Sequence, residues 1–307
     1  MDKVDPVMET VEHIIRKHFG CSADKIGKIR NVTNNDVYFF TLAGNDYFLK
    51  LYRSRNWPEE EKLPFVYQSL LQNNIPCAGL VAYCREDQTY PEGYLIEDRV
   101  QGTAADKTRL DKEQETDLYA RLAELVSSVH SIHIKNFGYI GSGIASHNSL
   151  AGFMDDEFDG FGDRLNGIVS EKQLKKLKEK VLDILNGFGD LPSVLCHGDL
   201  SKKNVIVQEN GGIALIDWDD AMALNWMADV SRLTFWMKQN YSRAEYTWFR
   251  NVFLEHYRAS GRKEEFDIFE NAYHIYTALD FLIFSRKVGD MEMESRLRSD
   301  LDSFSTL

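Results

Sequence analysis

The hydrophobic pattern of this chain changes abruptly near Gly102. Residues 25–52 are rich in β-branched and aromatic side chains and contain the turn pair Gly44-Asn45, which is typical of β-strands joined by a hairpin. From residues 111–133 onward, apolar side chains recur at helical spacing, and a β pattern returns only over 192–217. The order of these patterns predicts an α+β protein in which a β-rich part precedes a mainly helical part.

Two lobes follow from this pattern. The first, residues 1–101, is expected to hold an antiparallel sheet with a helix within residues 58–73, where Pro64 must begin or break it. The second, residues 102–307, is expected to be mainly helical with a small β insert. Its clearest helix has Ser170 as a candidate N-cap and Gly187 as a stop.

The charge and cysteine content exclude several classes of protein. Lys and Arg number 36 against 48 Asp and Glu, a net charge of −12, which argues against nucleic acid and anionic membranes as partners. No apolar run is long enough to span a bilayer. The four cysteines are scattered without a CxxC pair, so we expect reduced thiols in a cytoplasmic protein, without a zinc site or disulfides. Both a monomer and a homodimer fit the sequence.

Two motifs carry the chemistry: CHGDLSKKNVIV over residues 196–207 and IALIDWDD over residues 213–220. Asp199 followed five residues later by Asn204 has the spacing of a kinase catalytic loop, with a carboxylate for the attacking hydroxyl and an amide for a metal. Asp217 ends an apolar strand pattern, where a second metal-binding carboxylate would be delivered. An Asp-Asn pair alone is more often turn chemistry, but the two motifs together favour phosphoryl transfer.

These motifs resemble the aminoglycoside phosphotransferase and choline kinase family, small-molecule kinases with a protein-kinase-like bilobal fold. The resemblance implies that Asp199 is the catalytic base and that Asn204 and Asp217 bind Mg²⁺. It also implies that His197 and Asp229 support the catalytic loop. One departure is Asn225-Trp226, where the family commonly has Asp-Pro.

The resemblance further implies a lysine on the third strand that contacts the α- and β-phosphates of a nucleotide. Lys50 in YFLKLY takes that place, with a solvent-facing edge lysine as the alternative. In kinases this lysine pairs with a helix glutamate; Glu59, Glu60 and Glu61 are candidates, and we choose Glu61. Lys203 would stabilise the transferring phosphoryl group or point to solvent.

The nucleotide-binding segments are less specific. The expected phosphate-covering segment contains no glycine, and Thr33, Asn34 and Asn35 would fill it, unless they form an ordinary polar turn. By resemblance, the adenine would contact backbone groups near Glu97 and Arg99. The sequence does not distinguish ATP from GTP.

The substrate-binding residues are the least specified. Asp155, Asp156, Glu157 and Asp159 form an acidic cluster that would attract a cationic substrate, with a solvated helix start as the alternative. We therefore expect an ATP- and Mg²⁺-dependent kinase acting on a hydroxyl of an aminoglycoside or related antibiotic, and hence antibiotic resistance. The alternatives are a choline, ethanolamine, homoserine or methylthioribose kinase. A protein kinase is disfavoured because the interval from Asp217 to Asp229 leaves no room for a long activation segment, and a non-catalytic kinase-fold module because all three polar groups are present.

Overall fold

The computed structural model describes residues 6–30, 34–258 and 262–306. The chain divides into two compact units, one formed by Met1–Lys107 with Val205–Asp219 and the other by Thr108–Asn204 with Asp220–Leu307. The strands of the first unit and the helices of the second confirm the predicted α+β class. The functional boundary between residues 101 and 102 stays a prediction.

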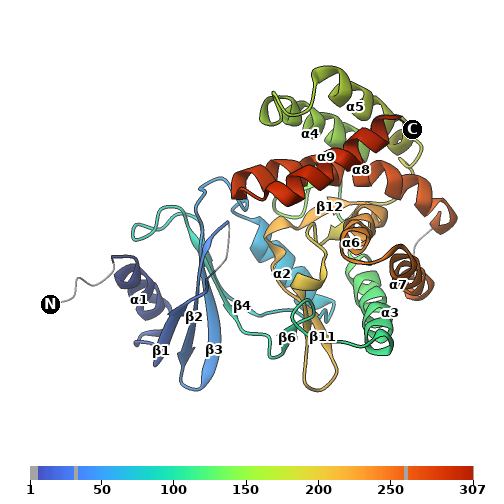
Figure 1. Ribbon diagram of the computed structural model, residues 1–307. Coiled ribbons are helices and arrows are strands. Elements are labelled where there is room, and N and C mark those ends of the chain that lie inside the picture. The colour runs from blue at the N-terminus through green and yellow to red at the C-terminus, as the bar shows by residue number, and fades with distance from the viewer. Residues whose placement is uncertain (1–5, 31–33, 259–261, 307) are drawn as a thin grey trace. The chain divides into compact units, whose positions relative to one another are not determined.

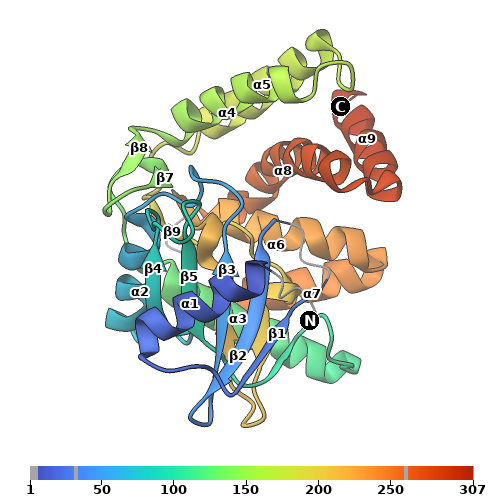
Figure 2. The same ribbon diagram turned by 90° about the vertical axis from the view of Figure 1, so that its left-hand side faces the viewer.

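The first unit is built around a five-stranded antiparallel sheet (Figure 1), and Figure 2 shows its strand order, β1-β2-β3-β5-β4. Its strands are β1 (Lys25–Lys28), β2 (Asp36–Leu42), β3 (Asn45–Leu51), β4 (Leu80–Cys84) and β5 (Tyr94–Asp98). Strand β3 is central, and its register pairs Lys50 with Leu95 and Phe48 with Glu97 of β5. Because successive side chains of a strand alternate between faces, Phe48, Lys50 and Glu97 share one face of the sheet.

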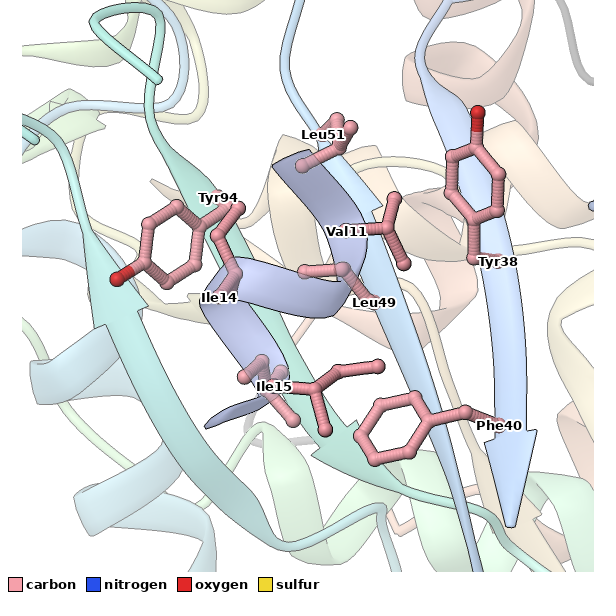
Figure 3. Close-up of a cluster of buried hydrophobic side chains, with 9 residues drawn as sticks. Val11, Ile14, Ile15, Tyr38, Phe40, Leu49, Leu51 and Tyr94 are labelled. Atoms are coloured by element: carbon pink, nitrogen blue, oxygen red, sulfur yellow. The ribbon is translucent and has the colours of Figure 1, made fainter. Parts of the chain in front are cut away.

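The opposite face of this sheet carries the hydrophobic core of the unit. Helix α1 (Pro6–Phe19) contributes Val11, Ile14 and Ile15, which lie on one helix face by their i, i+3, i+4 spacing. Figure 3 shows these side chains packed on residues of β2, β3 and β5, among them Leu49 and Leu51. Leu49 and Leu51 of β3 thus pack against α1, whereas Lys50 lies on the other face of the sheet.

Helix α2 (Lys62–Gln72) lies on the side of the sheet that carries Lys50, since its Tyr67 hydroxyl donates to Glu97. Pro64 is the third residue of this helix, within the first turn, where its missing N–H removes no helical bond. A small sheet with the order β11-β10-β6 completes the unit. Its strands are β6 (Thr103–Ala104), β10 (Val205–Val207) and β11 (Ile213–Leu215).

The second unit is mainly helical. Its helices are α3 (Lys112–Val129), α4 (Leu150–Arg164), α5 (Glu171–Asn186), α6 (Trp226–Asn240), α7 (Arg243–His256), α8 (Phe266–Val288) and α9 (Met291–Thr306). Helix α4 lies beside α5, and α8 beside α9 (Figure 2). Helix α5 has Ser170 as its N-cap, accepting from the N–H of Gln173, and Gly187 as its C-cap, so this sequence prediction is confirmed.

A four-stranded sheet with the order β8-β7-β12-β9 lies within the second unit. Its strands are β7 (Phe137–Ile140), β8 (Ala145–His147), β9 (Val194–Cys196) and β12 (Met222–Leu224). Strand β9 leads directly into the HGD motif, so this sheet sets where the motif begins. In the part of the chain that the structure describes, no helix combines the length and apolar character needed to cross a bilayer.

Candidate active site

The HGD motif forms a tight loop directly after β9 in the second unit. Gly198 has φ +78°, and a Cβ atom placed there would lie 1.8 Å from the carbonyl oxygen of Asp220. Only glycine combines this backbone angle with so close an approach of another backbone segment. The glycine of the motif therefore allows His197 and Asp199 to take their places on either side of it.

Asp229, in the first turn of α6, binds the backbone of this loop. Its carboxylate accepts from the backbone N–H groups of His197 (2.8 Å) and Gly198 (3.0 Å), and His130 Nε2 lies 3.1 Å away. Burial raises the pKa of Asp229, but the hydrogen bond with His130 and the other donors outweigh it, so the pKa lies below its ordinary value. These contacts are of the kind that the predicted loop-supporting role requires, and the role itself stays a prediction.

Asp199 and Asn204 face each other within the loop. Asn204 Nδ2 donates to the Asp199 backbone oxygen (2.8 Å) and to Asp199 Oδ2 (3.1 Å). Lys203 Nζ also lies 2.8 Å from Asp199 Oδ2, but its side chain is 53% exposed, so this ion pair adds little to stability. Asp199 Oδ1 is buried, and the described residues supply no hydrogen-bond donor to it. One carboxylate oxygen is thus held in place while the other is left as an acceptor.

Asn204 is oriented by the same contacts. Because its amide nitrogen serves Asp199, its amide oxygen is the atom left for another partner. An amide oxygen is a ligand that Mg²⁺ accepts. The residue therefore fits the predicted metal-binding role chemically.

Lys50 has partners in the first unit that differ from the predicted one. Its Nζ lies 2.7 Å from Asp217 Oδ1 and 2.8 Å from Asp219 Oδ2. Burial lowers the pKa of Lys50, but the two carboxylates outweigh burial and raise it well above its ordinary value. Glu61 lies at the N-cap of α2, and the described part of the chain contains no ion pair between it and Lys50. The structure therefore does not form the predicted pair of Lys50 and Glu61. Helix α2 begins after Glu61, and the carboxylates that contact Lys50 come from the IDWDD motif.

Asp217 follows β11 and has φ +66°, a left-handed conformation that Asp tolerates better than most residues. Its side chain is 47% exposed. Two residues later, Asp219 is buried and accepts a hydrogen bond from the Tyr52 hydroxyl at 3.1 Å. The motif thus offers Lys50 one exposed and one buried carboxylate.

Glu97 lies on the sheet face that carries Lys50. The Tyr67 hydroxyl donates to its carboxylate at 2.5 Å. Burial raises the pKa of Glu97 to about 7, although Lys50 and the Tyr67 hydrogen bond act in the opposite direction. The side chain is therefore held by α2, whereas the predicted adenine contact concerns the backbone of this segment and stays a prediction.

The raised pKa of Glu97 predicts a pH-dependent stability. Between pH 4.5 and about 7 the folded chain keeps a proton that the unfolded chain loses, so the free energy of unfolding falls as pH rises through this window. For this partly buried group we expect a loss of roughly 2–3 kcal/mol. Urea unfolding from pH 5 to pH 8 should show this loss in the wild type and not in Glu97→Gln. The exposed Glu86→Gln variant should behave like the wild type; equal pH dependence in Glu97→Gln and the wild type would contradict the prediction.

The other predicted nucleotide-binding residues lie apart from these contacts. Thr33 lies outside the described residues, and Asn34 and Asn35 directly precede β2, with Asn34 exposed. Arg99 follows β5, and its side chain pairs with Asp46 at 3.2 Å. Their roles toward a nucleotide stay predictions.

The acidic cluster of α4 has partners within its own unit. Lys178 pairs with both Asp155 and Asp159, and His147 Nε2 lies 2.8 Å from Asp156. Two of these carboxylates share one lysine and the third faces a histidine, which reduces the attraction that they exert on a cationic ligand. Any role in binding a substrate stays a prediction.

Glu157 differs from its neighbours because its partners are uncharged. The hydroxyls of Tyr139 and Tyr276 donate to its carboxylate at 2.7 Å and 3.1 Å. Burial raises the pKa of both tyrosines, and the charge of Glu157 adds to the effect. Tyr139 lies on β7, 18 residues before Glu157, and Tyr276 lies on α8, 119 residues after it.

The comparisons with known proteins agree with the motifs. The family model described as the phosphotransferase enzyme family (APH) matches residues 25–264. Comparison with curated proteins gave no match. The chain belongs to the phosphotransferase enzyme family, which confirms the resemblance seen in the motifs.

Solved structures share the whole fold. A thermostable mutant of aminoglycoside phosphotransferase APH(4)-Ia, in a ternary complex with AMP-PNP and hygromycin B, has a TM-score of 0.73 at 20% identity, covering 97% of this chain and 98% of that one. Choline kinase LicA from Streptococcus pneumoniae has a TM-score of 0.67 at 14% identity, covering 97% and 100%. The GDP and kanamycin complex of APH(2")-IIia has a TM-score of 0.65 at 12% identity, covering 98% and 99%. At these identities the likeness establishes the protein-kinase-like fold, and the family match establishes a phosphotransferase enzyme.

Proposed function

We propose that this phosphotransferase transfers the γ-phosphoryl group of ATP, or of GTP, to a hydroxyl group of a small molecule. The observation that carries the proposal is the Asp199 carboxylate, with Oδ2 held by Asn204 and Lys203 and Oδ1 buried without a donor. A carboxylate in this state can accept a hydrogen bond from an attacking hydroxyl and take its proton. Family membership supports the same role for this residue.

The remaining catalytic groups follow from their chemistry. Lys203, whose side chain is half exposed and whose Nζ lies beside Asp199, would stabilise the charge of the transferring phosphoryl group. Lys50 would contact the α- and β-phosphates. The oxygen atoms of Asn204 and Asp217 suit Mg²⁺, which would neutralise phosphate charge when bound. His197 and Asp229 would support the loop.

For the substrate we propose an aminoglycoside or a related antibiotic, with resistance as the consequence. The supporting observation is the match in fold to the hygromycin B and kanamycin complexes over nearly the whole chain. The second candidate is a choline or ethanolamine kinase, since Glu157 with the rings of Tyr139 and Tyr276 is the kind of group that binds a quaternary ammonium. Homoserine and methylthioribose are further candidates.

We propose a cytoplasmic protein without nucleic-acid or membrane partners, monomeric or homodimeric.

Nucleotide binding provides the first test. Mg²⁺-ATP at about 100 times its dissociation constant should stabilise the wild type by about 2.7 kcal/mol through mass action, seen as a higher melting temperature. Asp217→Asn should lose most of the additional stabilisation that Mg²⁺ gives over ATP alone. A panel of aminoglycosides, choline, ethanolamine, homoserine and methylthioribose, scored by release of ADP, then identifies the acceptor. A wild-type chain that neither binds Mg²⁺-ATP nor releases ADP with any alcohol would refute the proposal.

A further inference from the structure

We infer that Asp219 is the positioning residue of Lys50 and takes the place that a helix carboxylate holds in other kinases. The inference rests on the proposed function, because it assumes that Lys50 contacts the nucleotide. It concerns contacts within the first unit alone. Asp219 is not among the site residues predicted from the sequence.

Helix α2 cannot supply a carboxylate to Lys50. Its sequence, KLPFVYQSLLQ, contains no Asp or Glu. The helix contributes two other groups instead: the Tyr67 hydroxyl, which donates to Glu97, and the Lys62 ammonium, which donates to the Asp219 backbone oxygen at 2.8 Å. The helix thus positions the segment that carries the carboxylate rather than Lys50 itself.

Asp219 is held on several sides. Its Oδ2 accepts from Lys50 at 2.8 Å and its Oδ1 accepts from Tyr52 at 3.1 Å, while Lys62, which is fully buried, binds its carbonyl oxygen. Lys50 and Tyr52 flank Leu51, so both project to the same face of the chain as it leaves β3. Each carboxylate oxygen therefore has one donor, and the side chain is 10% exposed.

The two carboxylates near Lys50 differ in exposure. The Asp217 side chain is 47% exposed, and in the proposed function its oxygen atoms would bind Mg²⁺. Asp219 would then still hold Lys50, because a buried ammonium left without a partner is costly. Asp219 lies in the short helix Trp218–Asp220, which directly follows Asp217. One segment therefore positions both the proposed metal ligand and the partner of Lys50.

Kinetics of four variants test this role. Asp219→Asn keeps the shape of the side chain but removes its charge, and we expect kcat/KM for Mg²⁺-ATP to fall by about 10- to 100-fold, with KM for the alcohol unchanged. Tyr52→Phe should show a smaller loss in the same parameter. Glu61→Gln tests the competing helix carboxylate and should change kcat/KM less than about twofold. Glu86→Gln is the matched exposed control.

A double-mutant cycle separates positioning from general stability. If Asp219 acts through Lys50, Asp219→Asn should have little further effect on kcat/KM in a Lys50→Met background. Additive losses, or a loss in Glu61→Gln without one in Asp219→Asn, would overturn the inference. If the wild type shows no turnover, the proposed function fails on its own. The same cycle measured by urea unfolding then still tests the inference, since additive costs would show that Lys50 and Asp219 are not coupled.

Discussion

Asp199→Asn is expected to lower kcat by about 10²- to 10⁴-fold or more, with the dissociation constant for Mg²⁺-ATP changed by less than about threefold. The amide has nearly the shape of the carboxylate, and the Asn204 contact with the Asp199 backbone oxygen does not depend on the side chain. An amide cannot take a proton from the attacking hydroxyl, so only the chemical step should suffer. Single-turnover kinetics and calorimetric titration with ATP measure the two quantities separately.

Lys203→Met is the matched control for this prediction, because it removes a charge that lies 2.8 Å from the same carboxylate. The Lys203 side chain is half exposed, so we expect a smaller loss of kcat and a folded protein. Turnover of Asp199→Asn within tenfold of the wild type would remove Asp199 from the role of base. Loss of ATP binding in that variant would instead indicate that Asp199 holds the nucleotide.

Asp229→Ala is expected to reduce the free energy of unfolding by about 3–5 kcal/mol. The substitution leaves the backbone N–H groups of His197 and Gly198, together with His130, without their acceptor, and both histidines are buried. The HGD loop should loosen as well, so kcat should fall beyond what the lost stability explains. Urea unfolding followed by an assay below the transition measures both effects.

Asp163→Ala serves as the control, since Asp163 is an exposed residue of α4 in the same unit, and we expect a change within about 0.5 kcal/mol. Asp229→Asn keeps one acceptor oxygen and should lie between the two. A cost below about 1 kcal/mol for Asp229→Ala would show that other groups, or water, satisfy the loop.

In the IDWDD motif, one of the two carboxylates that contact Lys50 can be predicted from the sequence and the other cannot. Its first acid, Asp217, is found from its place after an apolar strand and its distance from Asn204. The importance of Asp219 is not visible in the same way, because a further acid next to such a motif is most often solvated. The hydrogen bond from Lys50 to Asp219 spans 169 residues, and only the packing of β3 against this segment creates it.

Glu61 illustrates the converse case. Three consecutive acids before an apolar run predict a charged first helical turn. The resemblance to kinases then implies that one of these acids pairs with Lys50. In the structure α2 begins only at Lys62, so the three acids precede the helix and the helix itself carries none. A shift of a few residues in a helix start is beyond what local sequence can settle, yet it decides which carboxylates reach a lysine.

The sequence by itself determined the β-then-α order, the HGD loop with its Asp-Asn spacing and the phosphotransferase family, because each depends on neighbouring residues and on backbone preferences that act locally. The tertiary structure alone decided the partners of the charged side chains: Asp219 for Lys50, Tyr67 for Glu97, Lys178 and His147 for three of the acids of α4. These partners lie on other elements or segments, between 9 and 169 residues away in the chain. Which of them meet depends on strand register and helix placement, and therefore on the packing of the whole unit.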